Sequence, residues 1–204
     1  MSARDLQTAV GEPSPGLAAR VAGIQWHRVC SELDVHGAAV IEHLLVPAEC
    51  DDLASRYARE DGFRSRVVMS RHGFGQGEYR YFSYPLPPLI AELRARSYAE
   101  LAPLANRWHE AMGLDPRFPE SHEAFVARCH AAGQTKPTPL LLHYLAGDYN
   151  CLHQDLYGEH VFPLQLVLLL SEPGRDFEGG EFVMTEQRPR MQLSLIHISE
   201  PTRH

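Results

Sequence analysis

The chain has 204 residues, 44% of them hydrophobic and 22% charged, which suits one domain with a sizeable core. Its formal net charge of −7 argues against a nucleic-acid backbone as the main partner, because phosphate binding needs a basic surface. The longest apolar run, residues 164–170 with Gln165 inside it, is too short to cross a bilayer.

Cysteine usage and the N-terminus bear on the compartment. The four cysteines are scattered without a CxxC pair, which suggests neither a zinc knuckle nor a disulfide framework and fits a reducing compartment. The first residues lack a basic start followed by an apolar stretch, so no signal peptide is predicted. We therefore expect a cytoplasmic protein without a membrane partner.

The N-terminal half mixes helices and strands. Pro47 with acids in the following turn indicates a helix start, and apolar residues repeat at helical spacing after Pro88. In chain order we expect a flexible arm over 1–20, a short buried strand over 37–45, a helix from Pro47, strands over 63–69 and 78–84, and helices over about 88–112 and 119–132.

The C-terminal half is rich in strand signals. Glycine-rich turns separate the expected strands, which cover 139–145, 149–154, 162–171 and 180–185. The segment 162–171 is apolar at nearly every position, which is typical of a strand buried on both faces.

The tripeptide His153-Gln154-Asp155 is the strongest chemical signal. Residues two apart on an extended strand point to the same face, so the imidazole and the carboxylate can reach one metal ion. The tripeptide alone is weak, but its surroundings strengthen it. Tyr144 precedes it, the Gly147-Asp148 turn leads into it, and an apolar run and the sequence FEGGEF follow it.

This ordered set resembles the 2-oxoglutarate- and iron(II)-dependent dioxygenases, nearest to their prolyl-hydroxylase-like branch, over about residues 138–186. The resemblance implies an α+β fold with a double-stranded β-helix (jelly-roll or cupin-like) core from about residue 138, incomplete at the C-terminus, and with N-terminal helices packed on it. It implies Fe(2+) held by His153 and Asp155, with 2-oxoglutarate as cosubstrate and O2 as oxidant, and it allows ascorbate as a further cofactor. The implied substrate is a small molecule or a protein side chain, with no nucleic acid expected.

The resemblance also implies residues that the chain does not supply. A third ligand, a histidine on a later strand, and a basic residue that anchors 2-oxoglutarate are both expected well after Asp155. His160 is too near, and His197 lies in the tail 193–204, which resembles a translated sequencing adapter. We therefore expect a single domain over 21–192, a non-native tail over 193–204, and a longer protein of which this chain is an inactive fragment.

Other residues keep two interpretations. Tyr144 either contacts the cosubstrate or is a half-buried structural residue, and Cys151 is expected to be a small core residue rather than a ligand. The tyrosines at 79, 81 and 84 either border the mouth of the site or pack in the core. The arginines at 64, 66, 71 and 80 form either a local basic patch or a solvated strand edge.

Two other functions remain open at this point. One is a cupin-like barrel that binds metal or a small molecule without oxygenase activity, and it would show no cosubstrate turnover. The other is a non-catalytic binding domain in which the His-x-Asp sequence is incidental, and it would bind iron no better than variants lacking His153 or Asp155.

Overall fold

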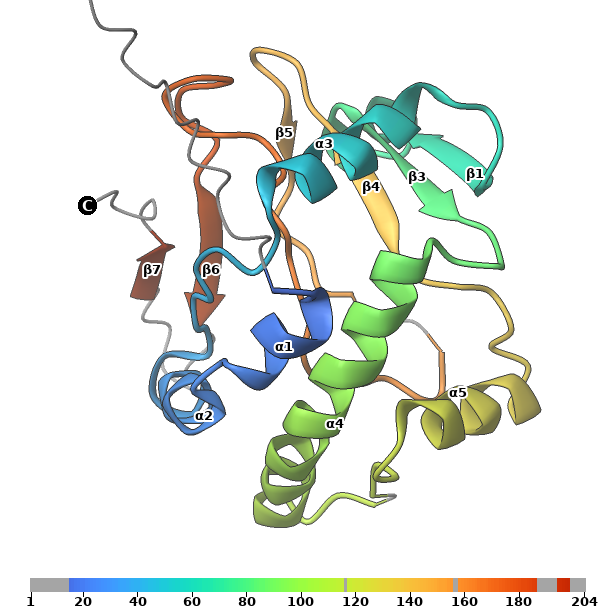
Figure 1. Cartoon of the computed structure of the whole chain (residues 1–204), viewed down its shortest axis with the longest axis vertical. Helices are drawn as coiled ribbons and strands as arrows, with labels where there is room; N and C mark the ends of the chain where they lie inside the picture. Colours follow the sequence, from blue (N-terminus) through green and yellow to red (C-terminus); the bar gives the residue numbers. More distant parts are fainter. Residues whose placement is uncertain (1–14, 116, 156–157, 187–193, 199–204) are drawn as a thin grey trace, which may run out of the picture.

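The computed structural model describes residues 15–115, 117–155, 158–186 and 194–198. Figure 1 shows helices α1, α2 and α4 in the lower half of the view and the sheet of β1, β3 and β4 in the upper half. The helices are α1 (Leu17–Ala22), α2 (Trp26–His36), α3 (Pro47–Ser55), α4 (Pro88–Ala111) and α5 (His122–Ala131). The strands are β1 (Phe63–Val68), β2 (Gly75–Gln76), β3 (Glu78–Phe82), β4 (Leu140–His143), β5 (Tyr149–Asn150), β6 (Phe182–Glu186) and β7 (Ser194–Ile198).

Helix α1 was not expected from the sequence. Leu17 and Val21, four residues apart on one helix face, are buried against Leu44 and against Leu93 of α4. Residues 17–20, expected in a flexible arm, therefore belong to a helix that packs on the core through Leu17, and residues 1–14 lie outside the described ranges. The sequence analysis also missed α2.

The expected helices α3, α4 and α5 are confirmed, and local capping explains where two of them start. The Glu49 carboxylate accepts a hydrogen bond of 3.0 Å from the Val46 N–H at the start of α3. At α5 the Ser121 hydroxyl accepts from the Ala124 N–H. Both contacts satisfy backbone donors that the first turn of a helix leaves unpaired.

The strand expected over 37–45 is wrong. The segment forms turns, and His43 has φ of 54°, a left-handed conformation that an extended strand excludes. Its apolar residues still contribute to the core, because Leu44 is only 7% exposed. The burial of Leu44 was therefore predicted correctly, but the backbone conformation of the segment was not.

The strands expected over 63–69 and 78–84 are confirmed as β1 and β3, which form an antiparallel three-stranded sheet in the order β1-β3-β4. A second pairing, β2 with β5, continues from it, because β2 precedes β3 by one residue and Gly75 is opposite Asn150. Strand β4 thus pairs with β3 and strand β5 with β2, so residues 140–150 run antiparallel beside residues 75–81. This path carries the backbone toward His153.

The expected strand over 162–171 is wrong in the described chain. The segment has no regular secondary structure, and Val167 and Leu169 are 59% and 60% exposed, while Leu168 packs on the core around α1 and α4. A strand needs a neighbour for its N–H and C=O groups, and no described strand lies beside this one. One side of the segment is therefore covered and the other is not.

Strand β6 matches the expected strand over 180–185, and it pairs antiparallel with β7. Strand β7 falls within the tail expected to be non-native. The sheets in the described ranges do not close into a barrel, so the double-stranded β-helix stays a prediction. No helix among the described residues has the length and apolar character needed to cross a membrane.

Candidate metal centre

The β4–β5 path positions the His-x-Asp sequence. Between the two strands, residues 145–148 form a turn in which Asp148 Oδ2 accepts from the Leu145 N–H at 2.8 Å. After β5, the Cys151 N–H donates to the Phe74 carbonyl at 2.8 Å. This backbone hydrogen bond fixes the chain two residues before His153.

Gly75 allows the close approach that this pairing needs. Its φ is +120°, and a Cβ atom there would lie 2.2 Å from the Tyr149 carbonyl oxygen. Any side chain would therefore force β2 and β5 apart.

The structure brings the His153 and Asp155 side chains together. His153 Nε2 lies 3.4 Å from Asp155 Oδ1, and the two side chains are 48% and 40% exposed. Residues 151–155 form no strand, yet the two side chains approach each other on one side of the chain, as the two-residue spacing predicts.

A hydrogen bond fixes the state of the His153 ring. Its Nδ1 lies 2.8 Å from the Cys151 carbonyl oxygen. A carbonyl can only accept, so Nδ1 carries the proton and, in the neutral ring, Nε2 keeps its lone pair. Metal-ligating histidines are commonly held in this way, with the second ring N–H bonded to a carbonyl or carboxylate.

Asp155 is oriented from its other side. The Gln165 side-chain amide donates to Asp155 Oδ2 at 2.6 Å, which leaves Oδ1 facing His153. When the ring is neutral, the Nε2 lone pair and a carboxylate oxygen face each other, and a cation between them would relieve the repulsion. Neighbouring ligands on one octahedral ion lie about 3 Å apart when each bond is about 2.1 Å.

The pair therefore fits two of the three ligands of a two-histidine, one-carboxylate iron site. Within the described ranges no three His, Cys, Asp or Glu side chains come together to complete it. The backbone of His160 is held to Gln134, whose amide accepts from the His160 N–H at 2.8 Å and donates to its carbonyl at 3.1 Å. His197 lies in β7, outside the residues whose side chains are described.

Tyr144 lies directly after β4, and its ring covers Gly77. A Cβ atom at Gly77 would come within 2.8 Å of Tyr144 Cδ1. Burial raises the pKa of the Tyr144 phenol, and a hydrogen bond with the Asn150 side chain partly offsets that rise. No contact in the described chain joins Tyr144 to His153 or Asp155, so its role toward a cosubstrate stays a prediction.

Cys151 is exposed, so the expectation of a small core residue is wrong. Its contribution to the site is its backbone, whose N–H and C=O bond Phe74 and His153. Exposure follows from the end of the sheet at this point, because no described element packs over the side chain.

The sequence analysis did not identify the residues that hold the segment after the motif. Phe162 packs into an aromatic cluster, with its ring centroid 4.9 Å from that of Tyr98 and 5.1 Å from that of Phe118. Gln134 fixes the neighbouring residue 160, as above. A usable signal existed only for Gln165, the one polar residue inside the apolar run.

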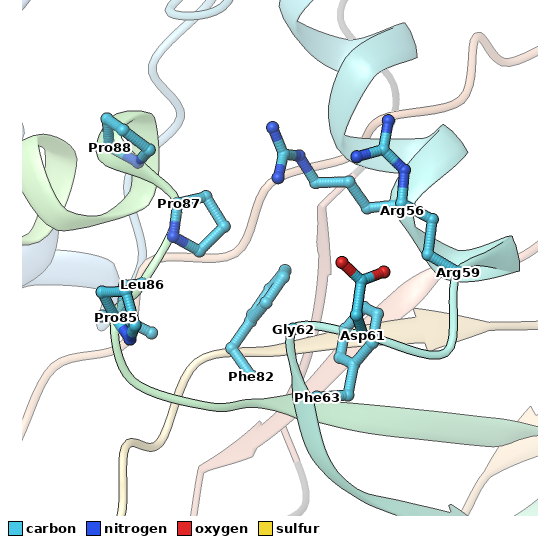
Figure 2. A pocket seen from close by; sticks show the side chains of 10 residues that line it. All are labelled: Arg56, Arg59, Asp61, Gly62, Phe63, Phe82, Pro85, Leu86, Pro87 and Pro88. Carbon is cyan, nitrogen blue, oxygen red and sulfur yellow. The ribbon is translucent and has the colours of Figure 1, made fainter.

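A separate pocket of about 250 Å³ lies between η1 (Arg56–Ala58), β1 and the start of α4. Figure 2 shows Arg56, Arg59 and the Asp61 carboxylate on one side of the Phe82 ring and prolines 85, 87 and 88 on another. Neither His153 nor Asp155 lines it. It is therefore distinct from the candidate metal centre.

The imidazole–carboxylate pair after β5 is a candidate for part of a metal site, and comparison with known proteins places the chain in an oxygenase family. Residues 77–201 match the family Oxygenase-NA, described as "Oxygenase, catalysing oxidative methylation of damaged DNA". The match covers more than half of the chain, which therefore belongs to this oxygenase family.

Two similar proteins come from two strains of Mycobacterium tuberculosis. They are named Uncharacterized protein MT2286 and Uncharacterized protein Rv2227, and each is 50% identical to the chain over 123 residues. The aligned region covers 60% of this chain and 53% of each relative, so the chain matches about half the length of these curated relatives. No solved structure matches the chain.

The family match bears on two expectations. Its description names damaged DNA, which is in tension with the expectation that no nucleic acid is a partner. It also extends to residue 201 and so overlaps the tail 193–204, whose adapter origin stays a prediction. The prolyl-hydroxylase-like branch is finer than the match supports.

Proposed function

We propose that the full-length protein is an iron(II)- and 2-oxoglutarate-dependent oxygenase that acts on a damaged base in DNA. The observation that supports the metal assignment is the convergence of His153 Nε2 and Asp155 Oδ1 at 3.4 Å, with Nδ1 turned to the Cys151 carbonyl. Membership of an oxygenase family supports the reaction class.

Iron with 2-oxoglutarate and O2 supplies the oxidising chemistry when bound. The chain's own residues would hold the metal and orient its ligands. Cys151 fixes the tautomer and ring plane of His153, and Gln165 fixes the carboxylate of Asp155. Pre-set ligands of this kind reduce the entropy lost when the metal binds. The third ligand and the residue that anchors 2-oxoglutarate come from outside the described residues.

The family description supports DNA as the substrate. The net charge of −7 led to the opposite expectation, but net charge averages over the surface and does not describe a local contact. One base is also a small target, because enzymes that modify bases in duplex DNA take a single base out of the stack.

The test is release of CO2 from labelled 2-oxoglutarate by the full-length protein with Fe(II). His153→Ala and Asp155→Ala should each lower the rate at least about 100-fold, because each removes a ligand. His160→Ala is the matched control and should keep the wild-type rate. Turnover that survives both ligand substitutions would exclude this metal site. Metal binding without turnover would favour a cupin-like binding barrel.

A second arm tests the substrate. Oligonucleotides with and without alkylated bases are incubated with the complete reaction mixture, and their masses are compared. A mass change confined to the alkylated strand is expected. Consumption of 2-oxoglutarate with no change in either strand would keep the oxygenase and exclude the DNA substrate.

A further inference from the structure

A β-bulge in β1 places Arg64 and Arg66, two residues apart, on opposite faces of the three-stranded sheet. Phe63 is opposite Phe82 but Ser65 is opposite Tyr81, so β1 has one extra residue at this point. Residues 64 and 66 would share a face on a regular strand. The bulge turns Arg64 over the Tyr81 ring, with its guanidinium carbon 4.2 Å from the ring centroid.

Arg66 remains on the other face. It is opposite Arg80 in the register, and its guanidinium forms an ion pair with Glu78. The arginines at 64 and 66, grouped in the sequence as one candidate patch, therefore face different surroundings.

Arg64 is held in place and yet keeps donors for a ligand. Its Nε donates to the Pro137 carbonyl at 3.1 Å, and the Tyr81 ring supports the plane of the guanidinium. Among the described residues no carboxylate forms an ion pair with it. The two terminal nitrogens of an exposed, pre-oriented guanidinium suit a phosphate oxygen.

The surface around Arg64 is aromatic and aliphatic. The Tyr79 and Tyr81 rings meet edge to face with centroids 5.4 Å apart. Opposite them on β4 are Leu142, which is 46% exposed, and Leu140. We call Arg64, Tyr79, Tyr81 and Leu142 the tyrosine face, and the strand residues on this side of the sheet include no acid.

The chain that forms the tyrosine face continues to the candidate metal centre. Tyr144 follows β4, and its ring lies over Gly77, the residue that precedes β3. From there the same stretch of chain passes through β5 to His153. The strands that form the face and the strand that precedes the metal ligands are thus parts of one continuous pairing.

We propose that the tyrosine face binds single-stranded nucleic acid beside the target base, with Arg64 on a backbone phosphate and a base against the aromatic and aliphatic surface. This inference rests on the proposed DNA substrate and adds the surface that receives it. Positive charge without acidic neighbours complements a phosphate, and planar aromatic side chains complement bases. Bulges are also frequent next to active sites, where they re-aim a side chain.

The test is fluorescence anisotropy of the full-length protein with a labelled single-stranded oligothymidylate. Arg64→Gln should raise Kd about 10-fold, since it removes a fixed phosphate contact. Arg66→Gln is the matched control, because it removes the same charge from the same strand on the opposite face, and it should change Kd less than about 2-fold. Arg64→Lys should recover part of the loss. Thermal unfolding checks that each variant is folded.

Three results would overturn the inference: equal weakening by Arg64→Gln and Arg66→Gln, which would indicate general charge attraction only; no weakening by Arg64→Gln; or no binding by the wild-type protein. The proposed oxygenase activity is measured separately, through 2-oxoglutarate turnover. Turnover without Arg64-dependent binding would exclude only the tyrosine face, and Arg64-dependent binding without turnover would exclude only the oxygenase.

Discussion

The side chain of Gln165 holds the carboxylate of Asp155 through a hydrogen bond of 2.6 Å to Oδ2. The two residues are ten positions apart, and the bond joins the segment after the motif to the motif itself. Because Oδ2 is occupied, Oδ1 is the oxygen that faces His153. Gln165 is thus a positioning residue for the candidate metal centre.

Gln165→Leu should weaken Fe(II) binding by the full-length protein about 10-fold, because residues that orient metal ligands typically change affinity by about 10- to 100-fold. Anaerobic Fe(II) titration measures it. Gln154→Leu makes the same chemical change between the two ligands, where the structure shows no side-chain bond, and should leave affinity near wild type. Equal affinities in all three proteins would exclude the orienting role.

Gly75→Ala should separate β2 from β5 and lower the free energy of unfolding by about 3 kcal/mol or more, because its Cβ would lie 2.2 Å from the Tyr149 carbonyl oxygen. Gly73→Ala is the control. Gly73 also has a positive φ, +72°, but a Cβ there meets nothing within 4 Å, so only backbone strain of about 1 kcal/mol is expected. Denaturant unfolding compares them, and similar losses would argue against the close pairing.

Phe162→Ala should lower the free energy of unfolding by about 2–3 kcal/mol, less than a fully buried phenylalanine, because the ring is only partly covered by its aromatic neighbours. Phe162→Leu keeps most of the volume and should lose about 1 kcal/mol. A loss below about 0.5 kcal/mol for the alanine variant would show that the segment after the motif is not anchored there.

Stability should fall in weak acid because of His122. Burial, with a smaller effect of Arg94, lowers its pKa to about 4 from 6.5. The unfolded chain takes up the proton first, so stability is complete above about pH 6.5 and is lost as the pH falls toward 4. Between pH 7 and pH 5 we expect a loss of about 1–2 kcal/mol from this group.

Urea unfolding at the two pH values measures that loss, and His122→Phe should reduce it. The substituted ring keeps the contact with Tyr98, whose centroid is 5.5 Å from that of His122, and cannot titrate. A pH dependence unchanged by the substitution would assign the effect to other groups.

The sequence predicted elements whose signals are local. Proline and acids marked the start of α3, apolar spacing marked α4, and alternating aromatic residues marked β3. The approach of His153 to Asp155 was also predictable from their two-residue spacing, although the strand expected to carry them ends at Asn150.

Long-range features were not predictable in this way. The strand expected over 162–171 needs a partner that no described residue provides, and apolar composition cannot reveal that. The role of Gln165 depends on a contact across ten residues, and the face of Arg64 depends on a bulge that interrupts the two-residue period. Each of these is set by tertiary pairing rather than by neighbours in sequence.

Crystals of the full-length protein grown anaerobically with Fe(II) would test the metal assignment most directly, through the anomalous signal at the iron edge. The account predicts a single peak about 2.1 Å from His153 Nε2 and from Asp155 Oδ1. Iron bound elsewhere, or a His153 ring turned away from Asp155 in the loaded protein, would contradict it.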